Sequence, residues 1–110
     1  MDNKKDDKYY LEKIVVDLIF LIEHTSGKTK AEIEEDAVLV DSVMFRLIQI
    51  AENSDKLSTD FKNVNNNLPW REIKGMRNRI VHDYGVVDMT IIYDTITKDI
   101  PKMYENLKKL

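Results

Sequence analysis

Apolar side chains recur along the chain at the three- and four-residue spacing of helices, and no alternating pattern of strands competes with it. The first such segment runs from about Lys5 to His24, with one apolar stripe formed by Leu11, Ile14, Val15, Leu18 and Ile22. Val16, Ile19 and Phe20 widen this stripe beyond what one neighbouring helix would cover. The extra width fits either a central core helix or a helix with part of a dimer interface on its outer face. Periodicity alone does not separate the two.

A second helix is predicted after Gly27, a residue typical of the end of a helix. Thr29 followed by Glu32 has the spacing of a capping box, which opens a helix. Helical spacing then continues to about Ser54, through Ile33, Ala37, Val40, Met44, Leu47 and Ala51. We therefore expect one long second helix, antiparallel to the first and joined to it by a short loop.

The segment from Asp55 to Leu68 is polar and rich in asparagine, which predicts a loop or a short irregular helix followed by one. Pro69 then suits the first position of a helix. A third helix is predicted from there to about Tyr84, where Gly85 stops it. Its buried side is predicted to carry Ile73, Met76 and Ile80.

Asp88 is a plausible N-cap for the last helix. Its apolar seam consists of Met89, Ile92, Ile96, Ile100, Met103, Leu107 and Leu110. Pro101 falls inside this seam and should kink or divide the helix. The prediction is therefore an all-α, antiparallel up-and-down bundle with four main helices, formed as a single domain by residues 1–110.

Composition agrees with a globular helical chain and narrows its chemistry. Of 110 residues, 43% are hydrophobic and 34% charged, with three glycines, two prolines and no cysteine. The lack of cysteine excludes disulfides, cysteine-ligated zinc and thiol chemistry. The start of the chain lacks the apolar core of a signal peptide, and the apolar stretch 14–22, interrupted by Asp17, is too short to cross a bilayer. We expect a cytoplasmic protein without a membrane segment.

The net charge of −3 is not that of an obvious nucleic-acid binder, but the placement of charge matters more than its sum. Acidic residues gather between Glu32 and Asp36, whereas basic ones gather on the third predicted helix, at Arg71, Lys74, Arg77 and Arg79. An anionic ligand would prefer the second region.

The third helix also carries the residues best suited to catalysis. At about 100° per residue, Asn78 and His82 share a face, and Arg77 and Tyr84 nearly align. Arginine binds phosphate through paired hydrogen bonds, and histidine moves protons near neutral pH. Because the 2′-hydroxyl of RNA can attack the neighbouring phosphate, no metal or other cofactor is required. The reaction needs both a base and an acid, and a single Arg–His pair does not readily supply both. A symmetric dimer that brings two such pairs together would supply them.

Simpler interpretations apply to the same residues. A lone arginine and histidine on a helix usually form a solvated face, and Tyr84 and Trp70 are commonly packing residues. His24 and His82 are far apart in sequence, and no Glu-x-x-His spacing marks a di-iron bundle. The chain also lacks a Gly-rich phosphate loop and a Gly-x-Ser-x-Gly elbow.

The pattern Arg77-Asn78-x-x-x-His82-x-Tyr84 resembles the Arg-x-x-x-x-His-x-Tyr signature of HepT-like proteins, a branch of the HEPN domain superfamily. The residues before it, Pro69-Trp-Arg-Glu-Ile-Lys-Gly-Met, and the late Asp99-Ile-Pro101 are also similar to that family. The likeness extends over essentially the whole chain.

The resemblance implies a metal-independent ribonuclease that dimerises, with two Arg…His motifs in a shared cleft. Arg77 would then bind the scissile phosphate, His82 would transfer protons or orient the attacking hydroxyl, and Asn78 would support either. HepT-like toxins are paired with a MntA-like nucleotidyltransferase antitoxin that transfers AMP to the signature tyrosine, here Tyr84. On this resemblance RNA is the substrate, with tRNA the first to consider.

Two other functions remain open at this point. The chain could be a non-catalytic HEPN subunit that helps a minimal nucleotidyltransferase to hold a nucleotide or substrate. It could also be a helical dimerisation protein without a ligand, for which the seam from Met89 to Leu110 would suffice. Retention of the full Arg…His signature favours the enzyme over the binding subunit.

Overall fold

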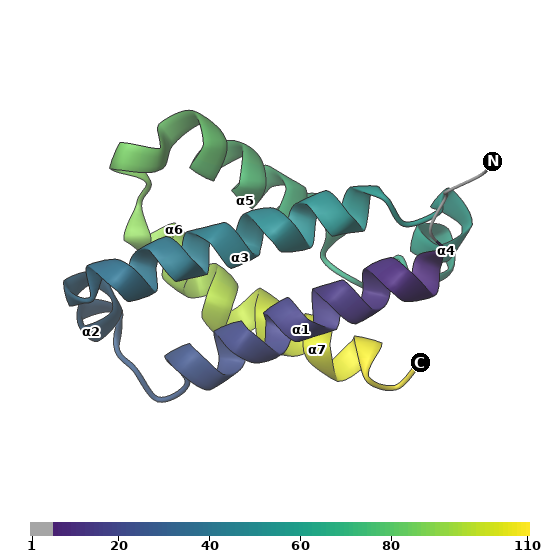
Figure 1. The fold of residues 1–110 in the computed structure, drawn as a ribbon, viewed down its shortest axis with the longest axis horizontal. Coiled ribbons are helices and arrows are strands. Elements are labelled where there is room, and N and C mark those ends of the chain that lie inside the picture. The colour runs from purple at the N-terminus through teal and green to yellow at the C-terminus, as the bar shows by residue number, and fades with distance from the viewer. Residues whose placement is uncertain (1–5) are drawn as a thin grey trace.

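The computed structural model describes residues 6–110, and every regular element in that range is helical. The elements are α1 (Asp7–Thr25), α2 (Lys30–Glu35), α3 (Ala37–Asp55), α4 (Thr59–Val64), α5 (Trp70–Asp83), η1 (Tyr84–Val86), α6 (Met89–Asp94), η2 (Thr95–Asp99) and α7 (Ile100–Leu107). Helices α1 and α3 run antiparallel at the centre, α5 packs on α3, and α7 packs on α1 (Figure 1). The predicted all-α antiparallel bundle is confirmed.

The predicted helix ends agree with the structure in most places. The expected start at Lys5 lies outside the described residues, and α1 is capped by Asp6, whose carboxylate accepts a hydrogen bond from the Tyr9 N–H at 3.0 Å. Gly27 has a φ of +75°, a left-handed conformation that favours glycine after a helix. The capping box is present, with reciprocal hydrogen bonds of 2.8 and 3.1 Å between Thr29 and Glu32.

The prediction of one long helix from Thr29 to Ser54 is wrong, because Asp36 divides it into α2 and α3. Asp36 has an extended backbone, and its carboxylate accepts a hydrogen bond from the Leu39 N–H at 3.0 Å. An aspartate that caps the next helix in this way competes with continued α-helical pairing. The short α2 can therefore turn away and pack on both α3 and α6.

The last helix is divided as expected near Pro101, but the irregular segment is the π-helical turn η2 that precedes the proline. The Ile100 N–H bonds to the Thr95 carbonyl, five residues earlier. The buried residues Ile92, Ile96 and Ile100 are four apart, so on an ideal α-helix they would drift by about 40° at each step. A wide turn takes up one additional residue and brings Ile100 back to the core side.

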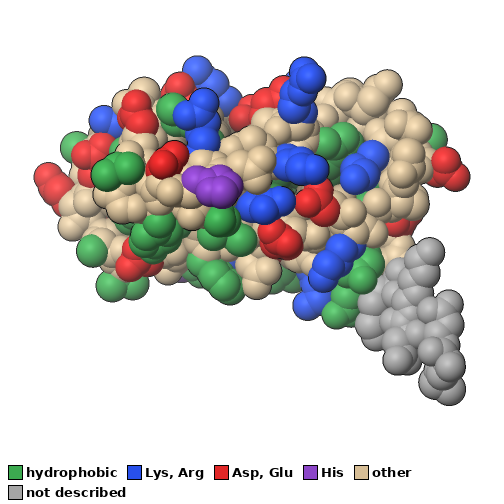
Figure 2. Space-filling view, turned by 90° about the horizontal axis from the view of Figure 1, so that it is seen from above, with side chains coloured by type: hydrophobic (Ala, Val, Ile, Leu, Met, Phe, Trp, Pro, Cys, Tyr) green, Lys and Arg blue, Asp and Glu red, His purple; other side chains and the backbone are tan. Residues whose placement is uncertain are grey.

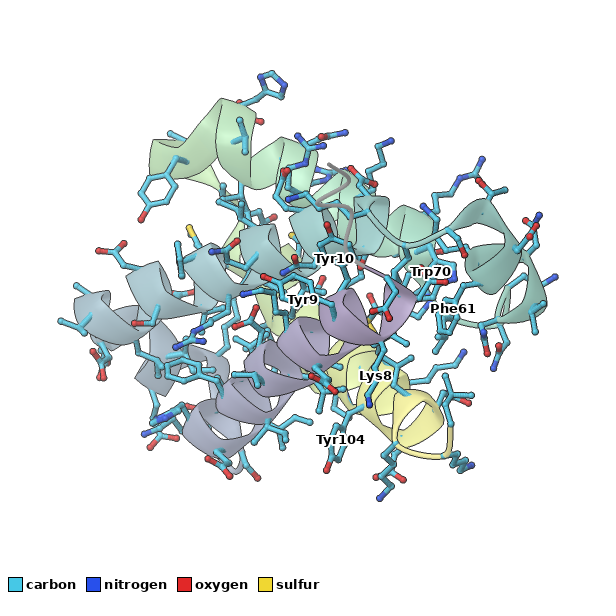
Figure 3. The ribbon with its side chains drawn as sticks, turned by 45° about the vertical axis from the view of Figure 1, so that its right-hand side comes forward. Lys8, Tyr9, Tyr10, Phe61, Trp70 and Tyr104 are labelled. Carbon is cyan, nitrogen blue, oxygen red and sulfur yellow. The ribbon has the colours of Figure 1, made fainter. Side chains whose placement is uncertain are left out.

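The core is almost entirely aliphatic and lies where α1, α3, α5 and α7 meet. Among its few polar members, Asp17 of α1 is buried and paired with Arg46 of α3 at 2.7 Å. At one end of the bundle, Trp70 at the start of α5 meets Phe61 of α4 edge-on (Figure 3). Within residues 6–110, no helix combines the length and the apolar character needed to span a membrane.

Candidate active site on helix α5

Helix α5 has one face in the core and one in solvent. Ile73, Met76 and Ile80 are buried as predicted, because their spacing keeps them on the side that packs against α3. The opposite side carries an exposed polar stripe formed by Arg71, Lys74, Asn78 and His82. Figure 2 views the molecule from this side, where lysine and arginine side chains gather beside a histidine.

His82 and Asn78 are both exposed and lie one turn apart near the C-terminal end of α5. Their predicted position on a common exposed face is therefore confirmed. No hydrogen bond or ion pair joins either side chain to another described residue, so both can turn toward a ligand.

Arg77 points from α5 across to α3 rather than along the exposed stripe. Its Nη2 atom lies 3.6 Å from Asp55 Oδ2, and its Nε atom lies 3.4 Å from Glu52 Oε1. The second contact has the distance of an ion pair but not the geometry of a hydrogen bond, and Nε is buried without a hydrogen-bond partner in the described part of the chain. The two carboxylates therefore orient the guanidinium, and some of its N–H donors remain without a hydrogen-bond acceptor among the described residues.

Tyr84 follows α5 in the short 3-10 turn η1, and its ring is half exposed. Its hydroxyl donates a hydrogen bond of 2.6 Å to Oδ1 of Asp41, at the beginning of α3. This hydrogen bond, a small loss of hydration and the negative charge of Asp41 raise the pKa of Tyr84 above its usual value. The phenol is therefore held protonated and oriented at neutral pH.

The sequence analysis missed the residues of α3 that hold this motif. Asp41, Glu52 and Asp55 lie along the stripe of α3 that faces α5. Because the two helices are antiparallel, Asp41 meets Tyr84 beyond the end of α5, whereas the other two acids meet Arg77 in its middle. A signal was available in their spacings of 11 and 3 residues, which return to the same side of a helix. These acids could not be assigned as partners of α5 before the helix order in space was known.

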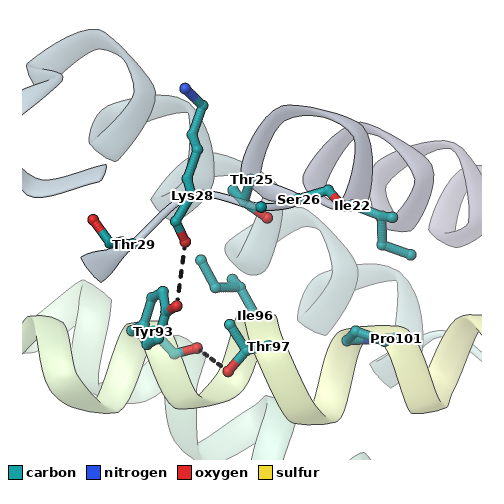
Figure 4. Close-up of a pocket in the computed structure, with 10 residues that line it drawn as sticks. Ile22, Thr25, Ser26, Lys28, Thr29, Tyr93, Ile96, Thr97 and Pro101 are labelled. Atoms are coloured by element: carbon teal, nitrogen blue, oxygen red, sulfur yellow. Dashed lines mark hydrogen bonds between the residues drawn. The ribbon is translucent and has the colours of Figure 1, made fainter. Parts of the chain in front are cut away.

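Another pocket, of about 410 Å³, lies between the α1–α2 loop and the C-terminal segment formed by α6, η2 and α7 (Figure 4). Its hydrogen bonds join the Tyr93 hydroxyl to the Lys28 carbonyl and the Thr97 hydroxyl to the Tyr93 carbonyl. Its lining includes neither a histidine nor an arginine, both of which α5 carries. Within residues 6–110, no cluster of three or more histidine, aspartate or glutamate side chains is placed to hold a metal ion.

The fold and the site together define a class: a small helical bundle whose helix α5 exposes an amide and an imidazole, with a phenol just beyond its end and a guanidinium turned toward α3. These groups suit phosphodiester chemistry. The model of the family described as "Ribonuclease HepT-like" matches residues 16–110. The chain belongs to this family, which assigns ribonuclease activity to it.

Named relatives agree with the family match. A protein from Caldanaerobacter subterraneus subsp. tengcongensis, named "Putative RNase", is 34% identical over 96% of this chain and 95% of its own length. "Probable ribonuclease HepT" from Thermococcus cleftensis is 33% identical over 97% of each chain. A Methanocaldococcus jannaschii protein, "Gamma-glutamylcyclotransferase and putative RNase", is 32% identical over 97% of this chain but 48% of its own length. No solved structure matches the chain significantly.

Proposed function

We propose that the chain is a metal-independent endoribonuclease toxin that cleaves RNA through Arg77, Asn78 and His82. The observation that carries the proposal is the exposed pair of Asn78 and His82, one turn apart on the outer face of α5. A substrate phosphate there would meet the proton-transfer group of His82, and the guanidinium of Arg77 would turn from α3 to reach the same phosphate.

In the proposed reaction the RNA 2′-oxygen attacks the adjacent phosphorus and the bond to the 5′-oxygen breaks. The 2′-hydroxyl loses a proton to a base, and an acid returns a proton to the leaving 5′-oxygen. One His82 serves only one of these roles at a time, so a homodimer would provide the second from its partner. Arg77 would bind the phosphate oxygens, where charge increases in the transition state.

The contacts of Arg77 have a consequence for this step. A phosphate must compete with Glu52 and Asp55 for the guanidinium, or use the donors that these carboxylates leave free. The acids would limit affinity for phosphate in general while holding the cation in position for a correctly placed one.

We further propose that Tyr84 is the site of regulation by a MntA-like nucleotidyltransferase antitoxin in the cytoplasm. The phenol oxygen would attack the α-phosphate of ATP, forming a tyrosyl–AMP ester and releasing pyrophosphate, with the phenol proton passing to a base. The half-exposed ring supports access by such a partner. The added phosphate would repel RNA beside the motif.

The test is cleavage of cellular RNA, with tRNA examined first, by purified unmodified protein in the presence of EDTA. His82→Ala should reduce cleavage at least about 100-fold, the scale of general acid–base catalysis. Because His82 is exposed, the helical circular dichroism spectrum and the oligomeric state should not change. Activity in His82→Ala equal to wild type would contradict the assignment.

The alternative is a non-catalytic subunit that helps a nucleotidyltransferase to hold a nucleotide or substrate. The engagement of Arg77 by two carboxylates favours it, since the cation is partly neutralised. Failure of clean, unmodified protein to cut any RNA pool, combined with specific binding to the transferase, would support this alternative.

A further inference from the structure

A groove between α4 and α5 continues the proposed active site toward the start of α5. It has a volume of about 420 Å³ and is lined by Asp55, Lys62, Trp70, Arg71, Lys74, Gly75 and Asn78. Asn78, one of the proposed catalytic residues, forms part of its wall. A ligand that occupies the catalytic position therefore has direct access to this groove.

The charge of the groove is positive and largely uncompensated. Lys62, Arg71 and Lys74 make no ion pair with another residue in the range 6–110. The one acid in the lining, Asp55, already contacts Arg77 at 3.6 Å. Three unpaired cations in one groove of a chain with a net charge of −3 form a local site for an anion.

The groove on the other side of α5 has the opposite character. It lies between α5 and α6 with η2, and its two cations, Arg79 and Lys98, are outnumbered by Glu72, Asp94 and Asp99. Burial and the nearby charge of Glu72 raise the pKa of Asp99 in this groove. An anionic chain leaving the active site would therefore follow the α4 side.

The length and openness of the α4 side suit an extended polymer. Arg71 and His82 are 11 residues apart on one stripe, which places them about 16 Å apart along the helix axis. Gly75 lies between them, and the space around its Cβ position is open to 4 Å. Because glycine has no side chain, a ligand can approach the helix backbone at this point.

The groove is also held in shape by the packing of its far wall. The Trp70 indole N–H donates to the Asn65 carbonyl at 3.0 Å, and the ring packs edge-on against Phe61 with a centroid separation of 6.3 Å (Figure 3). These contacts fix α4 to the start of α5. The cations therefore project from two elements whose relative position is set before a ligand arrives.

We propose that Lys62, Arg71 and Lys74 bind the sugar–phosphate backbone of single-stranded RNA beside the scissile bond. This proposal rests on the proposed ribonuclease site at His82, because the groove would bind the part of the RNA next to the bond cleaved there. Binding through phosphates is independent of sequence, so the groove would set the position and direction of the strand and leave the choice of bases to other contacts.

The test compares the salt dependence of RNA binding in two double variants with equal loss of charge. Arg71→Ala/Lys74→Ala removes two cations of the groove, whereas Arg79→Ala/Lys98→Ala removes two from the acidic side. The ligand is a fully 2′-O-methylated single-stranded RNA, whose blocked hydroxyls cannot attack, so wild-type protein can be measured directly. Circular dichroism checks the fold of each variant.

For single strands, the slope of log Kobs against log salt changes by about 0.7 per phosphate contact. Arg71→Ala/Lys74→Ala should reduce the slope by about 1.4, and the control pair should leave it near wild type. As a second variant, Gly75→Gln adds a side chain at the boundary of the two grooves without changing charge, and it should weaken binding with an unchanged slope.

The outcomes separate this inference from the nuclease proposal. Equal slopes in the two double variants, or no RNA binding by wild type, would overturn the groove whether or not RNA is cut. A selective loss of slope in Arg71→Ala/Lys74→Ala supports it. The same loss in a protein that does not cleave unmodified RNA would also support the groove while removing the catalytic role of His82.

Discussion

The hydrogen bond between Tyr84 and Asp41 joins the end of the motif helix to the start of α3, and it is the main cause of the raised pKa of the phenol. The folded pKa is raised, so the stabilisation is fully present below the ordinary value of about 10 and is lost as pH rises through the higher folded value. At neutral pH the link is intact.

Asp41→Asn should lower the pKa of Tyr84 toward its ordinary value, because the variant replaces the charged acceptor of the phenol's hydrogen bond with a neutral one and removes the negative charge that opposes ionisation. The measurement is a spectrophotometric titration of wild type and variant, in which Tyr84→Phe identifies the contribution of this ring. Superimposable titration curves for wild type and Asp41→Asn would show that the carboxylate charge of Asp41 does not govern ionisation of the phenol.

For single residues, the sequence predicted which face of a helix a side chain occupies better than it predicted which residue on another helix the side chain contacts. The exposed faces of Asn78 and His82 and the buried face of Ile73 follow from helical spacing, which is a local property. The pairing of Arg77 with acids 22 and 25 residues earlier is not local. It depends on which helices become neighbours, and periodicity carries no information about that.

Among the elements, α5 contains a glycine that its own packing does not require. Gly75 lies in the middle of the helix with open space where a Cβ would be. Glycine in a helix interior costs about 0.5–1 kcal/mol relative to alanine. The chain therefore gives up stability at the floor of the groove between α4 and α5.

Gly75→Ala should raise the free energy of unfolding by about 0.5–1 kcal/mol. For a chain of this size that corresponds to a higher Tm, at roughly 4–8 °C per kcal/mol. Gly27→Ala is the matched control and should lower Tm, because its φ of +75° strains any residue with a Cβ. A lower Tm in Gly75→Ala would contradict this prediction. It would indicate that Gly75 packs closely against a second molecule, since nothing within the described part of the chain lies near its Cβ position.

Helix existence was predictable, but one helix boundary was not. The same apolar spacing continues through Ile33, Ala37 and Val40, so the pattern gave no sign of a break at Asp36. The break depends on a side-chain hydrogen bond that competes with the helix. The wide turn η2 likewise reflects how Ile92 and Ile100 must both reach the core, a requirement set by tertiary packing.

Across the whole molecule, α1 and α3 are joined by an ion pair at the edge of an almost entirely aliphatic core. Arg46 donates to Asp17 at 2.7 Å and stacks on Phe20, with its guanidinium carbon 4.0 Å from the ring centroid. Asp17 is buried, whereas Arg46 keeps some contact with solvent. Loss of the carboxylate would leave a partly buried cation without its partner.

Asp17→Ala should lower the free energy of unfolding by about 1.5–3 kcal/mol, the range for hydrogen bonds to charged groups. Glu23→Ala, which removes an exposed acid from the same helix, should change it by less than about 0.5 kcal/mol. Urea unfolding measures both. Equal changes in the two variants would mean that the ion pair between Asp17 and Arg46 contributes little to the free energy of unfolding.

The wide turn η2 also gives the chain a place where its length can change. Removal of Lys98, an exposed residue of that turn, would leave Ile92 and Ile100 seven residues apart, only about 20° short of two full turns of an ordinary α-helix. The deletion variant should therefore fold with α7 still against α1, whereas deletion of Lys13 would rotate half of α1 by about 100° and should abolish folding. Thermal unfolding of the two variants tests this difference, and within homologous chains single-residue gaps are expected to collect at η2.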